Sequence, residues 1–149
     1  MHLLPIHQTP EENETLLNNP LCKGTVQVCI EYYKTIGYNP PWICYFVEED
    51  GEIIGSAGYK GKPVNNTIEI AYGTFDAHQN KSIGTRICRL LVETALQTDP
   101  FVTITARTLP ETNYSNRLLR KNGFVFTGVV NDPDDGDVWE WRYIANLIT

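Results

Sequence analysis

The stretch from residue 67 to residue 91 constrains the fold most, because it predicts a strand, a polar loop and a helix in direct succession. Residues 67–75 are rich in β-branched and aromatic side chains that alternate along a strand. Residues 82–97 carry apolar side chains at helical spacing. The first backbone N–H groups of a helix have no partner within the helix and attract anions. We therefore expect an anion site where the loop enters this helix.

The charges around the loop favour the same interpretation. The chain carries a formal net charge of −6, yet residues 77–92 contain no Asp or Glu and hold Lys81, Arg86 and Arg89. Lys81 and Arg86 are best placed to add positive charge at a bound phosphate. Taken alone, the stretch also fits an ordinary strand-to-helix corner in which Gly84 serves only the turn.

The rest of the chain predicts an α/β fold. We expect strands at residues 3–6, 42–48, 53–60, 101–107, 124–130 and 138–143, the last two joined by an exposed acidic turn at 131–137. Helices are expected from the Thr9 cap to Pro20, at 21–36 with Tyr32 and Tyr33 on the core side, and at 113–121. With the central stretch this makes one mixed, mostly antiparallel sheet of about seven strands with about four helices, in a single domain spanning 1–149.

Composition excludes several classes of protein. The acidic balance argues against nucleic-acid binding and weakly favours a cationic substrate. The four cysteines show no metal-ligand spacing, so we expect buried free thiols and no metal. The N-terminus lacks the features of a signal peptide, and no apolar run reaches membrane length. We expect a cytoplasmic protein with no membrane partner, either a monomer or a homodimer.

Three stretches together resemble the GNAT superfamily of acyl-CoA-dependent N-acyltransferases, and most of all its ribosomal-protein-type (RimJ/RimL-like) branch. The family's loop signature, Gln/Arg-x-x-Gly-x-Gly/Ala, stands here at Gln79 to Gly84. The preceding strand, Glu69 to Gly73, is typical of the branch. Thr108 to Ser115 and then Leu119 to Phe124 match the second signature of the branch. The resemblance covers residues 42–143 and implies a GNAT fold.

The sequence departs from the family pattern at two positions. The first glycine of the loop is Ser82, which is tolerable if its φ stays negative. The Asn that usually stands three residues before the Ser is Thr112 here, and the adjacent Asn113 is the candidate to replace it.

The resemblance implies acetyl-CoA as the donor and a primary amine as the acceptor, either a protein N-terminus or a small amine. Backbone groups of Tyr72 and Thr74 are then expected to pair with the pantetheine arm, and a backbone N–H of this strand to polarise the thioester carbonyl. The other residues expected to bind coenzyme A are Gln79, Asn80, Lys81, Ser82, Ile83, Gly84, Thr85 and Asn113.

Glu69 is the candidate general base, because burial among apolar neighbours raises the pKa of a carboxylate towards the useful range. A structural Glu paired with Arg is the alternative. Many relatives use a Tyr as the acid at the position of Leu119, so Ser115 is expected to protonate the leaving thiolate here, with Tyr114 a weaker candidate. An acyl-CoA-binding module without turnover is the second hypothesis. A nucleotide-binding domain fits poorly, because the strands before the loop are antiparallel.

Overall fold

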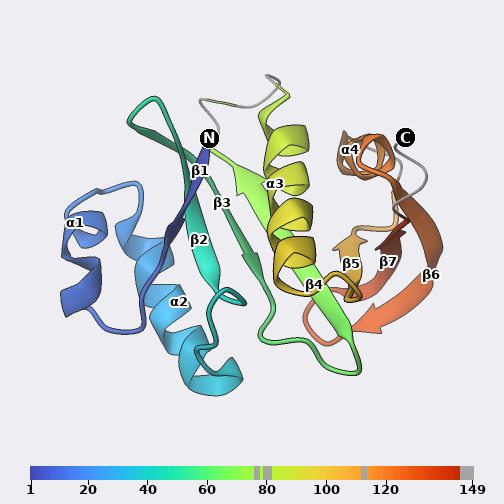
Figure 1. Cartoon of the computed structure of the whole chain (residues 1–149), viewed down its shortest axis with the longest axis horizontal. Helices are drawn as coiled ribbons and strands as arrows, with labels where there is room; N and C mark the ends of the chain where they lie inside the picture. Colours follow the sequence, from blue (N-terminus) through green and yellow to red (C-terminus); the bar gives the residue numbers. More distant parts are fainter. Residues whose placement is uncertain (76–77, 79–81, 112–113, 145–149) are drawn as a thin grey trace.

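The computed structural model describes residues 1–75, 78, 82–111 and 114–144 of the 149-residue chain. Within them the backbone forms one seven-stranded sheet (Figure 1). The strands are β1 (His2–Pro5), β2 (Cys44–Glu49), β3 (Glu52–Tyr59), β4 (Thr67–Thr74), β5 (Thr103–Thr108), β6 (Phe124–Asp132) and β7 (Gly136–Tyr143). The helices are the 3-10 turn η1 (Glu11–Asn13) and the α-helices α1 (Glu14–Leu17), α2 (Lys23–Ile36), α3 (Ile83–Thr98) and α4 (Tyr114–Lys121).

The sheet is mixed, with the order β1-β2-β3-β4-β5-β7-β6. All neighbouring strands pair antiparallel except β4 and β5, which are parallel and are connected through α3. The predicted α/β class, the strand and helix numbers and the mostly antiparallel sheet are confirmed for the residues described. Most predicted boundaries lie within two residues of the observed ones.

Local signals in the sequence explain where the helices begin and end. The Thr9 hydroxyl accepts the backbone N–H of Glu12 at 3.4 Å and donates to the Glu12 carboxylate at 2.8 Å, which fixes the first turn as the capping pattern predicts. Gly37 ends α2 with φ at +86°, a conformation that a residue without Cβ adopts freely.

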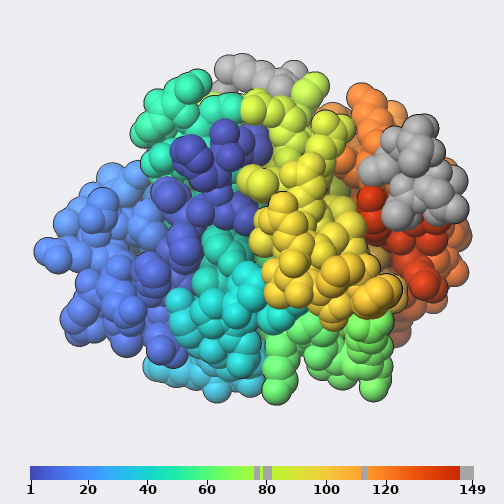
Figure 2. All heavy atoms as spheres, in the orientation of Figure 1, coloured from blue at the N-terminus to red at the C-terminus, as the bar shows by residue number. Residues whose placement is uncertain are grey.

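Helices α2 and α3 cover opposite faces of the sheet. The Cys44 side chain of β2 contacts Cys29 of α2, whereas the Tyr59 hydroxyl of β3 donates to the Leu91 carbonyl of α3 at 2.6 Å. Because Cys44 pairs with Gly58, the neighbour of Tyr59, and successive side chains alternate between faces, the two contacts lie on opposite sides. Figure 2 shows α3 between the N-terminal part of the chain and the C-terminal strands.

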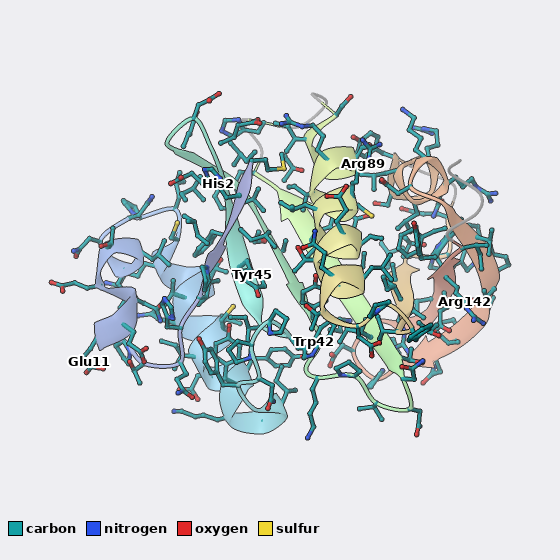
Figure 3. All side chains as sticks on the ribbon, in the orientation of Figure 1. His2, Glu11, Trp42, Tyr45, Arg89 and Arg142 are labelled. Atoms are coloured by element: carbon teal, nitrogen blue, oxygen red, sulfur yellow. The ribbon has the colours of Figure 1, made fainter. Side chains whose placement is uncertain are left out.

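Helix α4 lies beside α3 on the same face. The Asn122 amide, just past α4, donates to the Thr85 carbonyl in the first turn of α3 at 3.2 Å. Buried apolar side chains from α3, α4 and the sheet fill the space between them, including Ile87, Leu91 and Leu119 (Figure 3 draws the side chains). This packing fixes the first turn of α3 against α4.

Candidate functional site

Strands β4 and β5 separate after a short paired segment. Their parallel pairing joins Thr67 to Thr103, Ile68 to Ile104 and Glu69 to Thr105, and within the described residues it ends there. The remaining half of β4 and the end of β5 diverge, with β5 held instead by β7. The result is an open gap in the middle of the sheet.

The backbone of Tyr72 points into this gap. Antiparallel strands alternate between residues that bond to the partner strand and residues whose N–H and C=O point away from it. Lys60 N–H donates to Glu69 O at 3.0 Å, and Phe75 N–H donates to Ile54 O at 2.9 Å. Residues at the odd-numbered positions of β4 therefore bond to β3. Tyr72 and Thr74, at the even-numbered positions, direct their backbone groups towards the side that β5 has left.

The N-terminus of α3 stands beside this gap. Gly84, Tyr114, Ser115 and Tyr72 line one cavity of about 280 Å³ there, in company with Thr74 and His78. Ser82 precedes the helix with φ +58° and ψ +16°, in the left-handed region. Ser82 therefore does not meet the condition of a negative φ, because the chain turns at this point as the family's glycine would allow.

Gly84 serves the packing of α4 as well as the turn. A Cβ added at Gly84 would lie 2.7 Å from the Leu118 Cδ1 methyl and 3.6 Å from the Thr74 hydroxyl oxygen. Both Gly84 and Leu118 are buried. Only a residue without a side chain lets α4 approach the first turn of α3 this closely. Ile83 is likewise buried and contributes to the core.

The Arg86 side chain pairs with a carboxylate of the β2–β3 hairpin. Both of its terminal nitrogens hydrogen-bond to the carboxylate of Glu49 at the end of β2, one of them at 3.0 Å. The guanidinium of Arg86 holds the pKa of Glu49 below its ordinary value. Arg86 is thus held by a partner in the β2–β3 hairpin that sequence spacing does not show, and its contribution of charge to the anion site stays a prediction.

Glu69 faces two cations at the closed end of the gap. Lys60 Nζ lies 2.6 Å from Glu69 Oε2, and Arg107 Nε lies 3.5 Å from Glu69 Oε1. The Glu69 side chain is 17% exposed, so the predicted partial burial is confirmed. The structure thus realises the paired Glu of the alternative reading, while leaving Glu69 at the wall of a cavity.

Arg107 connects all four strands around the gap. Its Nη1 donates to Asp132 Oδ2 of β6 at 3.0 Å, and its Nε lies 3.6 Å from Glu140 Oε2 of β7 in addition to the contact with Glu69 of β4. This Nε is buried and makes no hydrogen bond within the described part of the chain. The guanidinium therefore holds the β6–β7 turn against the central strands.

The acidic turn at 131–137 is not uniformly exposed as predicted. Asp132 is buried, with Oδ1 accepting the backbone N–H groups of Asp134 and Asp135 at 2.9 and 3.2 Å. These N–H groups, followed by Arg107, lower the pKa of Asp132 from its ordinary value. The correction has a tertiary cause, because Arg107 comes from β5, 25 residues away.

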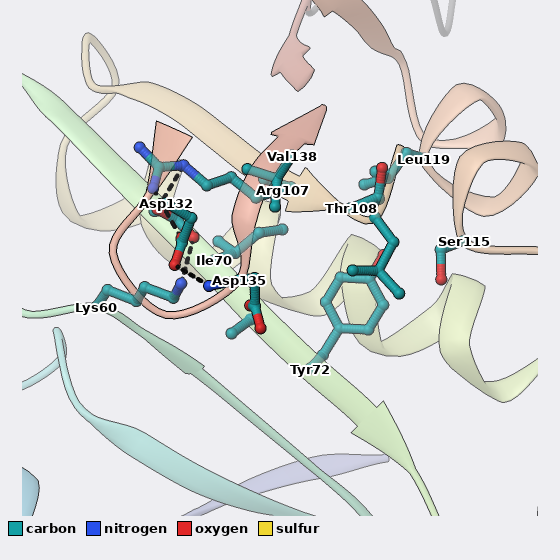
Figure 4. A pocket seen from close by; sticks show the side chains of 14 residues that line it. Lys60, Ile70, Tyr72, Arg107, Thr108, Ser115, Leu119, Asp132, Asp135 and Val138 are labelled. Atoms are coloured by element: carbon teal, nitrogen blue, oxygen red, sulfur yellow. Dashed lines mark hydrogen bonds and ion pairs between the residues drawn. The ribbon is translucent and has the colours of Figure 1, made fainter. Parts of the chain in front are cut away.

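One cavity of about 320 Å³ joins these groups (Figure 4). Its charged side chains gather at the end near Lys60, the outer part, and Ser115 lies at the opposite end with Tyr72 between them. The charged and hydroxyl-bearing residues that line it include Lys60, Glu69, Tyr72, Arg107, Ser115, Asp132 and Asp135. The charged side chains and Ser115, the hydroxyl expected to protonate the leaving thiolate, therefore border the same cavity.

The hydroxyl groups near the gap differ in accessibility. Ser115 is exposed and borders both the charged cavity and the cavity at the α3 N-terminus. The Tyr72 hydroxyl instead hydrogen-bonds with the buried Cys88 thiol of α3, and burial raises its pKa. Tyr114 is 44% exposed and borders only the cavity at the α3 N-terminus. Ser115 and Tyr114 are thus two exposed hydroxyls beside the gap that a leaving group could reach.

A third cavity, of about 370 Å³, lies on the α2 face of the sheet. Its floor includes Ala71 and Gly73, which are exposed although β4 is the central strand. Tyr32 of α2 forms part of its wall and is 37% exposed, so its predicted place in the core is wrong, whereas Tyr33 is buried as predicted. Lys60 borders this cavity and the charged one.

The sequence reasoning missed Lys60, Arg107, Asp132 and Asp135 as site residues. Charged residues at strand ends are usually expected to face solvent. Here the pairing of β4 with β5 and of β6 with β7 brings them together. The predicted site residues Gln79, Asn80, Lys81 and Asn113 lie outside the described residues. Tyr72, Thr74, Gly84 and Ser115 line one cavity, while Ser82 precedes α3 and Ile83 and Thr85 lie in its first turn.

Comparison with known proteins decides the family. The sequence profile described as "Acetyltransferase (GNAT) domain" matches residues 1–125. The chain belongs to the GNAT acetyltransferase family. An uncharacterized N-acetyltransferase of Bacillus subtilis, YjdG, is 31% identical over 121 residues, which cover 80% of this chain and 67% of that protein. The predicted enzyme class, an N-acetyltransferase, is confirmed at this level.

Solved structures of GNAT enzymes share the fold. A spermidine N-acetyltransferase SpeG chimera from Vibrio cholerae and hSSAT aligns with a TM-score of 0.71 and 14% identity, over 97% of this chain and 95% of that chain. The aminoglycoside acetyltransferase AAC(6')-Ib in complex with coenzyme A and kanamycin gives 0.68 and 22%, over 98% and 94%. RimL, a ribosomal-protein alpha-N-acetyltransferase, gives 0.68 and 17%, over 95% and 91%.

Two further observations concern the class of site. None of the helices described has the length and apolar composition required to cross a membrane. Across residues 1–75, 78, 82–111 and 114–144, no group of three or more His, Cys, Asp or Glu side chains is arranged to hold a metal ion.

Proposed function

We propose that this GNAT enzyme transfers an acetyl group from acetyl-CoA to a primary amine by direct attack, without a covalent enzyme intermediate. The observation that carries the proposal is the gap between β4 and β5, into which the Tyr72 backbone points beside the N-terminus of α3. An extended amide-containing chain can add to such a strand edge as a further strand would.

The pantetheine arm of the donor would lie along the edge of β4 at Tyr72 and Thr74. Its pyrophosphate would then meet the first N–H groups of α3, at Ile83, Gly84 and Thr85, where the helix dipole favours an anion. The backbone N–H groups on the same edge suit polarisation of the thioester carbonyl. Coenzyme A and acetyl-CoA are present in solved complexes of the similarly folded aminoglycoside enzyme.

Two proton transfers are proposed. The amine gives a proton to Glu69, and Ser115 gives a proton to the leaving thiolate. Glu69 borders the cavity, and an amine within hydrogen-bond reach, directly or through one water, can pass its proton to the carboxylate. Lys60 and Arg107 hold the carboxylate in place. Ser115 is the accessible hydroxyl at the opposite end of the same cavity.

A cationic acceptor suits the outer part of the cavity. Asp132 and Glu69 are paired there, while Asp135 makes no ion pair within 4.0 Å among the residues described. Tyr32 adds an exposed aromatic ring on the wall of the adjacent cavity on the α2 face, and the face of this ring can bind a cation. Membership of the RimJ/RimL-like branch, supported by the two signature stretches, makes a protein N-terminus one candidate and a small amine the other.

Thermal unfolding with added ligands tests the proposal. Acetyl-CoA and free coenzyme A are expected to raise Tm, with NAD and ATP as controls that leave it unchanged. A ligand at about one hundred times its Kd adds roughly 2.7 kcal/mol to the free energy of unfolding. Absence of a shift with either coenzyme A species would reject the donor.

Release of free thiol separates an enzyme from the alternative, a binding module without turnover. A panel of peptide N-termini and small amines is incubated with enzyme and acetyl-CoA, and the thiol is measured. Turnover with at least one amine supports the enzyme. Binding of coenzyme A without thiol release from any amine would favour the module.

A further inference from the structure

Lys60 places a primary amine of the protein inside the proposed acceptor site. Its Nζ lies 2.6 Å from Glu69 Oε2, and its side chain lines both the charged cavity and the cavity on the α2 face. We propose that Lys60 is an internal acceptor: when no external amine is bound, the enzyme transfers the acetyl group of acetyl-CoA to its own Lys60 Nζ. This inference rests on the proposed function.

The contact with Glu69 meets the first requirement for an acceptor. A general base must lie within hydrogen-bond reach of the proton that it removes. Lys60 Nζ already has this relation to Glu69, so an external amine that uses the same base must displace it or share the carboxylate. Lys60 alone, among the lysines that the structure describes, lines the cavity that contains Glu69 and Ser115.

The backbone holds Lys60 beside the base while its side chain keeps freedom to move. Lys60 N–H, just past the end of β3, donates to the Glu69 carbonyl of β4 at 3.0 Å, which fixes the two residues opposite each other. The Lys60 side chain is 41% exposed, so the amine can swing along the cavity from Glu69 towards Tyr72 (Figure 4). A tethered amine reacts as part of the same molecule, which raises its effective concentration strongly.

The reaction balances without any further reactant. The Lys60 ammonium gives one proton to Glu69, and the neutral Nζ attacks the thioester carbonyl carbon of acetyl-CoA. The new N–C bond forms as the C–S bond breaks, and the electron pair of that bond leaves on sulfur. The thiolate takes up a proton from Ser115 or water, and the attacking nitrogen gives its second proton back to that group as it becomes an amide. The products are acetylated Lys60, free coenzyme A and the one proton that Glu69 accepted and then releases.

Acetylation would change the site that it occurs in. An acetamide carries no positive charge, so Lys60 would lose its ion pair with Glu69. Glu69 would keep only Arg107 as its cationic partner among the residues described. The outer part of the cavity would become more negative, and the acetyl group would occupy space at the border of the two cavities.

Mass spectrometry tests the proposal directly. The purified full chain is incubated with acetyl-CoA and no amine, digested with trypsin and mapped. Trypsin does not cut after acetyl-lysine, so modification of Lys60 appears as a missed cleavage that carries one acetyl group. The expected result is preferential labelling of Lys60, at a rate per molecule that does not depend on protein concentration.

Three variants identify the cause of the labelling. Lys60→Arg keeps the positive charge and should lose the modification, while Lys62→Arg, at an exposed lysine two residues away, should leave Lys60 labelling unchanged. Glu69→Gln should slow labelling of Lys60 by about 100-fold or more, the range of general base catalysis. A thermal melt of each variant shows that it is folded.

The outcomes separate this inference from the proposed function. Equal labelling of Lys60 and the exposed lysines, or labelling that survives Glu69→Gln, would show non-enzymatic acetylation and overturn the inference. Thiol release with an external amine but an unmodified Lys60 would overturn the inference while supporting the proposed function. Failure of coenzyme A to bind would remove both.

Discussion

Glu69 Oε1 and Arg107 Nε lie 3.5 Å apart across the point where β4 and β5 cease to pair. Glu69 belongs to the last paired position, and Arg107 stands two residues beyond its partner, Thr105. The Arg107 guanidinium also bonds to Asp132 in the β6–β7 turn. The ion pair therefore lies where the gap begins and connects the candidate base to the turn that closes the charged cavity.

Replacement of Glu69 tests its role as the base. Glu69→Gln keeps the shape of the side chain and removes its ability to take a proton, so we expect kcat for an external amine to fall by about 100-fold or more. The rise of Tm with coenzyme A should persist. Glu140→Gln is the matched control, since Glu140 also faces Arg107, at 3.6 Å, without lining the cavity. An unchanged kcat in Glu69→Gln would contradict the role.

The neighbouring hydroxyls Ser115 and Tyr114 can be told apart by kinetics. Ser115 borders both cavities and Tyr114 only one, so Ser115→Ala should lower kcat by about 100-fold, whereas Tyr114→Phe should leave it near that of the parent. Steady-state rates with saturating acetyl-CoA provide the measurement. The reverse pattern would assign the proton donor to Tyr114.

The close approach of Gly84 to Leu118 predicts a coupled effect on stability. In Gly84→Ala the new Cβ would lie 2.7 Å from Leu118 Cδ1, and such overpacking costs about 1–3 kcal/mol, offset in part by the better helix propensity of Ala, about 1 kcal/mol. With Leu118→Ala already present the clash disappears, and Gly84→Ala should become stabilising. Urea unfolding of the four proteins in the cycle measures this, and additive effects would argue against the contact.

Ser82 predicts a stability difference between small and branched side chains. Its φ of +58° is favourable for Gly and costs an L-residue roughly 1–2 kcal/mol. Ser82→Gly relieves this strain but adds freedom to the unfolded chain, so we expect a gain of up to about 1 kcal/mol. Ser82→Val should be clearly destabilising. Chemical denaturation checks both, and equal losses in the two variants would show that the backbone conformation is not the cause.

The pKa of Asp132 predicts how stability responds to acid. Its folded pKa is lowered by the N–H group of Asp134 and by Arg107, so the ionised form is favoured in the folded state. The stabilisation is fully present above the unfolded pKa of about 3.9 and is lost as pH falls through the lowered folded pKa. Asp132→Asn should be less stable than the parent at neutral pH, and the two should converge in acid. A difference that stays constant down to strongly acidic pH would contradict this.

The order of strands and helices followed from local patterns. Alternation in residues 67–75, helical spacing in 82–97 and the stop at Gly37 depend on interactions between near neighbours, which a sequence displays directly. The partial burial of Glu69 followed in the same way from its apolar neighbours. The signature stretches led to the correct superfamily, because glycine and small residues at a helix N-terminus leave a recognisable spacing.

The partners of the charged side chains did not follow from local patterns. Arg86 reads as a phosphate ligand beside the loop, yet it bonds to Glu49, 37 residues earlier. Asp132 reads as a solvent-exposed turn residue, yet it is buried against Arg107. Tyr32 reads as core, yet α2 places it at the wall of a cavity. In each case the contact joins elements whose relative position depends on how the sheet is paired.

The sequence by itself determined the elements, their order and the family of this protein, because those depend on periodicity, capping and short motifs. The tertiary structure alone decided that β5 leaves β4 after Glu69, that Arg107 reaches three acidic side chains from three other strands, and that Lys60 meets the candidate base. Strand pairing in this sheet joins residues far apart in the chain. The sequence around a charged side chain therefore does not reveal which partner this pairing brings to it.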